Sequence, residues 1–476
     1  MLTSPAPAAR GADRSAQASE DPAPSAPCIR SEAVRAYDIR GVVGKDIEPP
    51  DARALGLAYA TEARSRGLRR IGVLRDGRLT SPELEAALVD GLVEGGMRVE
   101  RFGLGPTPQL AFAVRTRALD GGVMVTASHN PPAENGFKLL LGPERIHGAA
   151  LKALVSAPGL PSRRGFAVDA DVTEAYVDRL AQAAADARPL KVVWDCGNGA
   201  TGPVVSRLAP RLAGLHELRH TRVDGRFPNH HPDPAVAANL AELRRAVVEG
   251  GCDLGVAFDG DGDRIGVVDE EGEIIWADQL LLYLAADILK ERPGATVVAD
   301  VKSSRVLFDG VARRGGRAVV APSGYVLIRE AMRRERAALA GELSGHIFFA
   351  DYGEGTDDAL YVAARLLCVL SRSGQSLAQF RRALPKSVTT PELRIPCPEP
   401  RKAAVVAEVA ARLAGEGAVF DTALGLRVIG EDGWWLLRAS GTEAKLTCRC
   451  EAPDELALER LQARLKAELK ASGVDL

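Results

Sequence analysis

The sequence predicts an α/β protein in which three similar α/β domains are followed by a smaller α+β C-terminal domain. Short apolar runs each end in an acid and a loop, at Asp76, Asp195 and Asp300, roughly a hundred residues apart. Helical patterns surround these runs, and strands that alternate with helices indicate α/β layers. The last ninety or so residues differ, because "WWLLRASGTEAKLTCRCEA" predicts strand, loop and strand before an amphipathic helix.

The amino-acid composition is that of an ordinary globular protein. The chain has 476 residues, 46% of them hydrophobic and 26% charged, and a formal net charge of -2. The length predicts three or four domains. Because the charges balance, the protein as a whole does not attract nucleic acid or lipid electrostatically. The sequence has no run of about 18 apolar residues, so it predicts no membrane-spanning helix. Seven scattered cysteines favour reduced thiols and a cytoplasmic location.

Composition shifts place the expected boundaries. An Ala-, Pro- and Ser-rich segment predicts a disordered tail over 1–28. The domains are expected at 29–172, 173–272, 273–385 and 386–476. After the first apolar run we expect a helix capped by Ser81, with Leu84, Leu88 and Leu92 on one stripe.

A serine loop follows a predicted buried strand. "GGVMVTA" is the strand, and "SHNPPAENG" is rich in turn residues, so Ser128 begins a loop at a strand end. Ligands bind there in many α/β proteins. The flanks lack the Gly-x-Ser-x-Gly of an esterase elbow. A turn serine that only caps backbone amides is the alternative.

Three carboxylates alternate with glycines in "AFDGDGDR". Asp259, Asp261 and Asp263 would repel one another unless a cation joins them, and such hard oxygen ligands suit Mg²⁺ or Ca²⁺. An EF-hand is excluded because its sixth position must be Gly and is Arg264 here, and because the flanks predict strands. Arg264 also indicates an anionic ligand beside the metal. A solvated acidic turn is the alternative.

Two further loops carry polar groups that suit a sugar phosphate. In "GELSGH", Glu342, Ser344 and His346 alternate, and an acceptor with a hydroxyl can bind a pair of sugar hydroxyls. "RASGT" offers a guanidinium, hydroxyls and backbone amides for a phosphate, from Arg438, Ser440, Gly441 and Thr442. Solvated strand ends are the alternative for both. Together the loops predict phosphoryl transfer on a phosphorylated sugar or polyol.

These motifs resemble those of the α-D-phosphohexomutases, and most closely the bacterial phosphomannomutase/phosphoglucomutase group. The resemblance rests on "RAYDIRGVVG", "TASHNPPAENGFK", "DGRFPNHHPDP", "AFDGDGDR", "GELSGH" and "RASGT", which occur in the family's order. It implies four domains around a central cleft. It also implies an isomerase that interconverts hexose 1-phosphate and hexose 6-phosphate, of mannose or glucose or both.

The resemblance further implies that Ser128 is carried as a phosphoserine. Mg²⁺ would be bound by that phosphate together with Asp259, Asp261 and Asp263. The phosphoryl group passes to the sugar, a hexose 1,6-bisphosphate forms and also serves as activator, and the other phosphate returns to the serine. Metal and cations offset the charge on the transferred group.

Other roles are carried over by the same resemblance. Lys138, Arg40 and His129 are the candidates for the proton partner of the serine. Glu342 and Ser344 would hold the 3- and 4-hydroxyls of the sugar. The remaining expected substrate-binding residues are Tyr37, Arg264, Lys302, Gly324, Tyr325, His346, Arg438, Ser440, Gly441 and Thr442. Relatives often have Gly-His-Ser where this chain has Gly324-Tyr325-Val326, so an imidazole contact is in doubt, and we expect Tyr325 still to touch the ligand.

Two alternatives stay open for the activity. A phosphoglucosamine mutase typically opens with "FGTDGIRG"-like sequence rather than "AYDIRG". An inactive sugar-phosphate-binding relative would lack the serine or the aspartates, and both are present. The expected partners are small sugar phosphates, with no nucleic acid and no membrane, and the chain is expected to be a monomer or a weak homo-oligomer.

Overall fold

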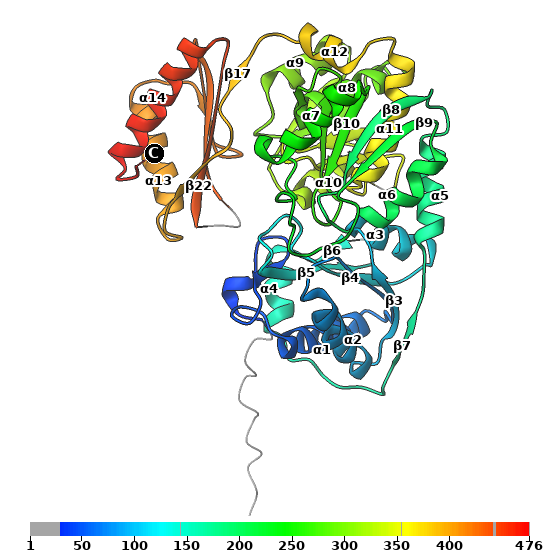
Figure 1. Ribbon diagram of the computed structural model, residues 1–476. Coiled ribbons are helices and arrows are strands. Elements are labelled where there is room, and N and C mark those ends of the chain that lie inside the picture. Colours follow the sequence, from blue (N-terminus) through cyan, green and yellow to red (C-terminus); the bar gives the residue numbers. More distant parts are fainter. Residues whose placement is uncertain (1–28, 143, 354, 441–443, 476) are drawn as a thin grey trace, which may run out of the picture.

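The computed structural model describes residues 29–142, 144–353, 355–440 and 444–475. The predicted disordered tail over 1–28 lies outside the described residues. Figure 1 shows the N-terminal domain in blue, the second and third domains together in green and yellow, and the C-terminal domain in orange and red. The predicted architecture of three α/β domains and one α+β domain is confirmed.

The first domain contains a mixed seven-stranded sheet in the order β1-β5-β4-β2-β3-β7, with β6 paired to β5. Strands β2 and β4 are parallel, and β5 returns antiparallel to β4. The elements are η1 (Ser31–Ala33), β1 (Ile39–Val42), α1 (Pro49–Ser65), β2 (Arg70–Arg75), α2 (Ser81–Glu94), β3 (Arg98–Leu104), α3 (Thr107–Thr116), β4 (Gly121–Val125), β5 (Glu134–Leu141), β6 (Glu144–Arg145), α4 (Gly148–Ser156) and β7 (Phe166–Asp169).

The second domain contains a five-stranded sheet in the order β12-β11-β10-β8-β9. Strands β8 and β10 are parallel, and β11 returns antiparallel to β10. The elements are α5 (Thr173–Ala183), β8 (Leu190–Asp195), α6 (Gly202–Leu208), η2 (Ala209–Arg211), β9 (Gly214–Arg219), η3 (Ala237–Leu240), α7 (Ala241–Gly250), β10 (Leu254–Phe258), β11 (Ile265–Asp269) and β12 (Ile274–Ile275).

The third domain contains a four-stranded sheet in the order β14-β13-β15-β16. Strands β13 and β15 are parallel, and β16 returns antiparallel to β15. The elements are α8 (Ala277–Glu291), β13 (Thr296–Asp300), α9 (Arg305–Arg313), β14 (Arg317–Ala321), α10 (Tyr325–Arg334), β15 (Leu339–Gly341), β16 (Ile347–Phe349), α11 (Ala359–Ser373) and α12 (Leu377–Ala383).

The C-terminal domain contains an antiparallel six-stranded sheet in the order β17-β22-β21-β20-β19, with β18 paired to β22. Helices α13 and α14 pack on this sheet. The elements are β17 (Val388–Thr389), β18 (Leu393–Pro396), α13 (Lys402–Gly415), β19 (Phe420–Asp421), β20 (Leu426–Gly430), β21 (Gly433–Ala439), β22 (Lys445–Ala452) and α14 (Glu455–Ala471).

The repeated domains place their functional loops at equivalent positions. In each, two parallel strands are followed by an antiparallel strand, and the turn into that strand carries a predicted motif. The β4–β5 turn carries Ser128, the β10–β11 turn carries the aspartates, and the β15–β16 turn carries Glu342. The three apolar runs that end at Asp76, Asp195 and Asp300 are the strands β2, β8 and β13, which hold the same place in the three repeated units.

Helix α2 differs slightly from its prediction. Leu84, Leu88 and Leu92 form the expected buried stripe. Ser81, however, is the first residue of the helix, and Thr80 occupies the cap position. The Ser81 hydroxyl donates instead to Asp76 Oδ1 at 2.6 Å. The Ser81 oxygen also accepts from Asn135 Nδ2 at 2.9 Å. The expectation that Ser81 caps the helix is therefore wrong, because its hydroxyl is used by Asp76 and Asn135 and not by a backbone N–H of α2.

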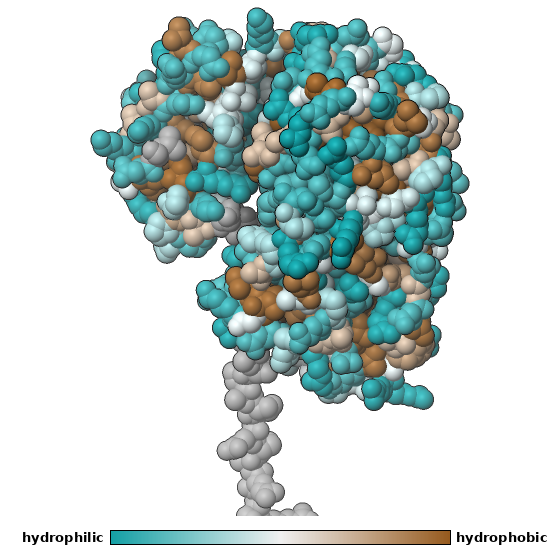
Figure 2. Space-filling model, viewed as in Figure 1, coloured by the Kyte–Doolittle hydropathy of each residue, from teal (hydrophilic) through white to brown (hydrophobic). Residues whose placement is uncertain are grey.

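The first three domains share a hydrophobic core, and the C-terminal domain has a separate one. One large cluster runs through the second and third domains and reaches the first, whereas the C-terminal domain has its own core. That domain contacts the third through Lys302 Nζ and Glu392, at 2.7 Å, and through Ser304 and Glu451, at 3.0 Å. Figure 2 shows a groove between the C-terminal domain and the rest of the chain. Among the described residues, no helix is both long and apolar enough to cross a membrane.

Candidate active site

Ser128 lies at the centre of the meeting point between the first and second domains. It follows β4 and adopts the left-handed region, with φ at 53°, a conformation that costs energy for a residue with a side chain. Its backbone N–H donates to Thr126 Oγ1 at 2.8 Å. Its hydroxyl donates to Asp259 Oδ2 at 2.6 Å. The serine loop and the aspartate loop, 131 residues apart in sequence, therefore form one site.

A buried arginine holds the strained serine loop in place. The Arg78 guanidinium donates to four carbonyl oxygens at 2.6–2.8 Å, those of Ser128, Asn130, Pro131 and Glu134. It also pairs with Asp76, and neither side chain of this pair is more than 2% exposed. Phe227 of the second domain covers the guanidinium at 5.4 Å. These contacts, which we call the Arg78 clamp, hold the backbone of the Ser128 loop in place.

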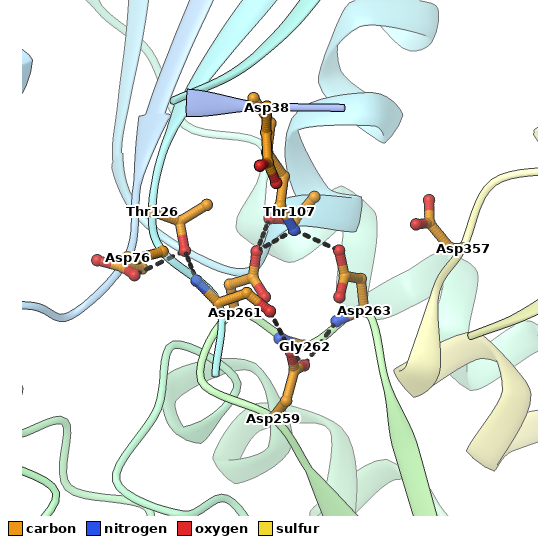
Figure 3. A network of polar contacts seen from close by, with 12 residues as sticks. Asp38, Asp76, Thr107, Thr126, Asp259, Asp261, Gly262, Asp263 and Asp357 are labelled. Atoms are coloured by element: carbon orange, nitrogen blue, oxygen red, sulfur yellow. Dashed lines mark hydrogen bonds and ion pairs between the residues drawn. The ribbon is translucent and has the colours of Figure 1, made fainter. Parts of the chain in front are cut away.

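The aspartate loop folds around one of its own carboxylates. Asp259 Oδ1 accepts from the backbone N–H groups of Gly262, Asp263 and Arg264 at 3.0–3.1 Å. Gly260 is required for close approach, because a Cβ there would lie 2.5 Å from the Ser128 carbonyl oxygen. Figure 3 shows the three aspartates converging, with Asp357 further away.

Lys138, on β5, compensates the charge of two aspartates. Its Nζ lies 2.6 Å from Asp261 Oδ2 and also bonds Asp263 Oδ2. Although burial acts to lower it, these two carboxylates raise the pKa of Lys138. Burial acts to raise the pKa of Asp261 and of Asp263, but Lys138 outweighs it, and both pKa values lie below their usual range. Thr107 at the start of α3 also donates to Asp261.

The carboxylates fit a divalent cation. Asp259, Asp261 and Asp263 each offer an oxygen, and these oxygens lie within 4.8 Å of one another. Asp261 Oδ1 and Asp263 Oδ1 are buried without a hydrogen-bond partner in the described structure, which is costly unless another group satisfies them. Burial, then Asp261 and Asp263, raise the pKa of Asp259 well above its usual range. A hard cation would satisfy these oxygens.

The three proton-transfer candidates all surround Ser128, but with different charges. His129 Nδ1 lies 3.2 Å from Ser128 Oγ. Burial, then Arg264 and Arg40, lower the pKa of His129 well below its usual range. Arg40 pairs with Asp38 at 2.8 Å, and although burial opposes it, Asp38 raises the pKa of Arg40. Near neutral pH, His129 is the neutral member of the three candidates, while Lys138 and Arg40 stay charged.

The "GELSGH" turn lies beside the aspartate loop. Arg264 Nε donates to His346 Nε2 at 3.1 Å, and His346 Nδ1 faces Asp357 Oδ2 at 3.4 Å and Asp263 Oδ1 at 3.7 Å. Burial raises the pKa of Glu342. Ser344 is half-buried in the turn. The sugar-binding loop and the aspartate loop therefore share one set of polar contacts.

Tyr37 and the Gly324-Tyr325 pair join the first and third domains. Tyr37 Oη donates to the Ser323 carbonyl at 3.2 Å, and Tyr325 Oη donates to the Tyr37 carbonyl at 3.3 Å. A Cβ at Gly324 would meet Tyr37 Oη at 2.4 Å. The Tyr325 ring lies 4.6 Å from the Arg145 guanidinium and 5.9 Å from Lys138 Nζ. Burial raises the pKa of Tyr325 to about 12, so its hydroxyl stays protonated.

The structure describes part of the "RASGT" loop, the predicted phosphate-binding loop. Arg438 is the penultimate residue of strand β21, and Ser440 directly follows the strand, with its carbonyl accepting from Lys402 Nζ at 2.6 Å. The electrostatic influence of Arg438 reaches Tyr37 and Glu392. Gly441 and Thr442 lie outside the described residues. Lys302, bonded to Glu392, lies at the junction of the third and C-terminal domains.

Several structural contributors were not singled out from the sequence. In "RDGR" the strand-end pattern points to Asp76 and not to Arg78, and Thr107 lies outside every predicted motif. Arg145 and Asp357 form a buried ion pair at 2.8 Å between the first and third domains. A charged residue in an otherwise apolar or turn-rich stretch was the available signal for Arg78. No local pattern indicated the other three, because their partners are distant in sequence.

Comparison with known protein families matches each domain. The matching family models are phosphoglucomutase/phosphomannomutase α/β/α domain I over 31–149, domain II over 174–272, domain III over 276–388, and the C-terminal domain over 392–468. Together they cover most of the chain in the order of the four observed units.

Relatives and solved structures agree with that match. A phosphoglucomutase of Neisseria gonorrhoeae is 41% identical over 93% of this chain and 98% of its own length. A phosphomannomutase/phosphoglucomutase of Pseudomonas aeruginosa PAO1 is 41% identical over 94% of this chain and 97% of its own length. A crystal structure of a phosphoglucomutase/phosphomannomutase family protein from Burkholderia thailandensis is 38% identical, with a TM-score of 0.86 over 94% of this chain and 100% of that one.

The fold and the site, with these matches, define a hexose phosphate mutase, an isomerase that acts by intramolecular phosphoryl transfer. The chain belongs to the phosphoglucomutase/phosphomannomutase family.

Proposed function

We propose that the protein interconverts hexose 1-phosphate and hexose 6-phosphate, of mannose or glucose or both, through a phosphoserine at Ser128. The observation that carries this proposal is the 2.6 Å hydrogen bond from Ser128 Oγ to Asp259, inside a cluster of three buried carboxylates. The carboxylates around this serine offer oxygen ligands for a cation, which a simple hydrolytic serine does not need. Ser128 is well placed to carry a phosphoryl group beside a cation.

In the first step the phosphoserine is the donor. The 6-hydroxyl of a hexose 1-phosphate attacks the phosphorus, the bond from phosphorus to Ser128 Oγ breaks, and the hydroxyl proton leaves to a base. The product is hexose 1,6-bisphosphate, and the serine oxygen takes up a proton. The fixed loop around Ser128 serves this step because in-line transfer depends on positioning.

In the second step the bisphosphate turns around and the roles reverse. The Ser128 hydroxyl gives its proton to a base and Oγ attacks the 1-phosphate, the bond from that phosphorus to the sugar oxygen breaks, and the sugar oxygen takes up a proton as hexose 6-phosphate leaves. Glu342 and Ser344 bind the sugar hydroxyls in either orientation. Arg438 and Ser440 bind whichever phosphate is not reacting. Added hexose 1,6-bisphosphate activates the protein because it phosphorylates an empty serine.

Mg²⁺ is the cation we propose for Asp259, Asp261 and Asp263, because all the ligands are oxygens. When bound, it would neutralise negative charge on the transferred phosphoryl group. Lys138 keeps two of the aspartates ionised and in place before the cation arrives. The six described cysteines are buried and unpaired, which suits the reducing cytoplasm we propose as the location.

We assign proton acceptance to His129. It is the candidate with a neutral ring near pH 7 and with a nitrogen 3.2 Å from Ser128 Oγ. Replacement by Gln should lower kcat by about 100-fold or more, the usual contribution of general acid–base catalysis. His346→Gln is the matched comparison, because His346 lies in the same site. If His346→Gln loses kcat and His129→Gln does not, the assignment to His129 is wrong.

The activity itself is tested by turnover of purified protein with mannose, glucose and glucosamine 1-phosphates, with Mg²⁺ and hexose 1,6-bisphosphate present. Conversion of mannose or glucose 1-phosphate to the 6-phosphate supports the proposal. Preference for the glucosamine substrate would indicate a phosphoglucosamine mutase. Binding without turnover would indicate an inactive relative.

A further inference from the structure

A second cluster of ligand-type side chains lies in the second domain, apart from the site around Ser128. Asp195 ends strand β8, His220 follows the end of β9, and His230 lies in the loop before η3. Each offers one nitrogen or oxygen, and these three atoms lie within 4.8 Å of one another. Asp195 is fully buried, and the two imidazoles are about one-seventh exposed. The proposed phosphoryl transfer uses none of the three.

Both ring nitrogens of His230 face acceptor oxygens. Nδ1 lies 3.1 Å from the His231 carbonyl, and Nε2 lies 2.8 Å from Asp195 Oδ2. A neutral imidazole carries one hydrogen, so one of these contacts needs either a second proton or a cation. Asp195 Oδ1 is already fixed by the backbone N–H of Gly197 at 2.9 Å, so Oδ2 is the oxygen directed at the imidazole.

His220 supplies a second imidazole in a similar setting. Its ring centroid lies 5.4 Å from that of His230, in an edge-on arrangement. Its Nε2 lies 3.1 Å from Glu242 Oε2, and when Nε2 donates this bond, Nδ1 keeps a lone pair. A histidine that binds a metal usually donates its other N–H to a carboxylate or a backbone carbonyl. Glu242 and the His231 carbonyl provide that arrangement for His220 and His230.

We propose that Asp195, His220 and His230 bind a divalent transition-metal ion of the zinc class. Two imidazole nitrogens and one carboxylate oxygen suit Zn²⁺ or Co²⁺ and disfavour Mg²⁺, which takes oxygen ligands. The ligand set therefore differs in kind from the three aspartates of the active site. Glu242 is an outer partner that orients His220.

The residues around the cluster show how an ion could reach it and which part of the active site it would support. His220 lines a surface cavity together with Asn198, Asp224 and the arginines Arg222 and Arg226, so the cluster is reached from solvent at His220. The segment between the two histidines carries Phe227, whose ring covers Arg78 at 5.4 Å. Since Arg78 holds the Ser128 carbonyl, an ion at this site would stabilise the loop that supports the serine. The role we infer is structural.

Cobalt is the probe that tests the site. The full chain is titrated with Co²⁺ in excess Mg²⁺, which occupies the oxygen-only site, and the visible absorption of nitrogen-ligated Co²⁺ is followed. We expect one such ion per chain. Its affinity should fall at least tenfold in His220→Gln and in His230→Gln. His147→Gln is the control, because His147 also pairs with a carboxylate, Glu330 at 3.1 Å, but outside the cluster.

Two further measurements keep the test decisive if a variant folds poorly. X-ray absorption of wild-type chain loaded with one Zn²⁺ should show two imidazoles, and Zn²⁺ should raise Tm in wild type and not in His230→Gln. A metal environment of oxygen alone would overturn the proposal. So would equal Co²⁺ affinity in wild type and folded His230→Gln, which would mean that His230 is satisfied by a proton. Neither readout depends on mutase activity.

Discussion

Replacing Lys138 by Met tests how the apo site tolerates three buried carboxylates. The substitution keeps an unbranched side chain only one atom shorter and removes its charge. Lys138 is 2% exposed and bonds both Asp261 and Asp263, which are fully buried. Breaking a buried ion pair from one side typically costs about 3–5 kcal/mol, because a charge stays buried without its partner. We expect a loss of this size in the free energy of unfolding when Mg²⁺ is chelated.

Urea unfolding with EDTA and with Mg²⁺ measures this effect. Mg²⁺ should restore part of the lost stability in Lys138→Met, since a cation replaces the missing charge, and should stabilise wild type less. Lys191→Met is the matched control, because Lys191 Nζ bonds the neutral Gly250 carbonyl, and its loss should cost about 1 kcal/mol. Equal stability of Lys138→Met and wild type in EDTA would refute the view that Lys138 compensates the aspartates.

Three other predictions follow from the contacts of the site. Arg78→Lys should lower kcat on the order of 100-fold by releasing the Ser128 loop, whereas Arg226→Lys, at a side chain 71% exposed, should leave it unchanged; steady-state kinetics of both decides. Tyr325→Phe should lower kcat/KM several-fold, which corresponds to the free energy of one hydrogen bond to the ligand. An unchanged kcat/KM would show that the hydroxyl does not touch the ligand. Burial raises the pKa of Asp358 to about 6 from 3.8, so the folded state binds the proton first and stability should rise by about 2 kcal/mol as pH falls from 7 to 4. Urea unfolding of Asp358→Asn should lack this slope, and an identical slope would contradict the assignment.

The repeated units were predictable because each is encoded locally. A buried strand ends in Asp76, Asp195 or Asp300, and helical periodicity surrounds it, so the pattern alone indicates α/β layers. The four motif loops were predictable for a similar reason, since each places unusual polar side chains next to glycines and prolines. Their convergence on one site came from the family resemblance, because spacing along the chain carries no information about it.

The supporting contacts were not predictable from local pattern. The Arg78 clamp needs the loop after β4 to fold over it, and Thr107 meets Asp261 only when the first two domains pack together. Ser81 was expected to cap α2, and the structure gives its hydroxyl to Asp76 instead. Each case depends on a buried partner from another element, and tertiary contact then outweighs local preference.

The central claim is that Ser128 carries the phosphoryl group. Purified protein is treated with glucose 1,6-bisphosphate, its intact mass is measured, and the peptide that contains Ser128 is sequenced by mass spectrometry. The mechanism predicts one added phosphate, located on Ser128, which is still present after the sample turns over hexose 1-phosphate because each cycle returns a phosphoryl group to the serine. Full mutase activity in protein that never carries phosphate on this peptide would contradict the mechanism.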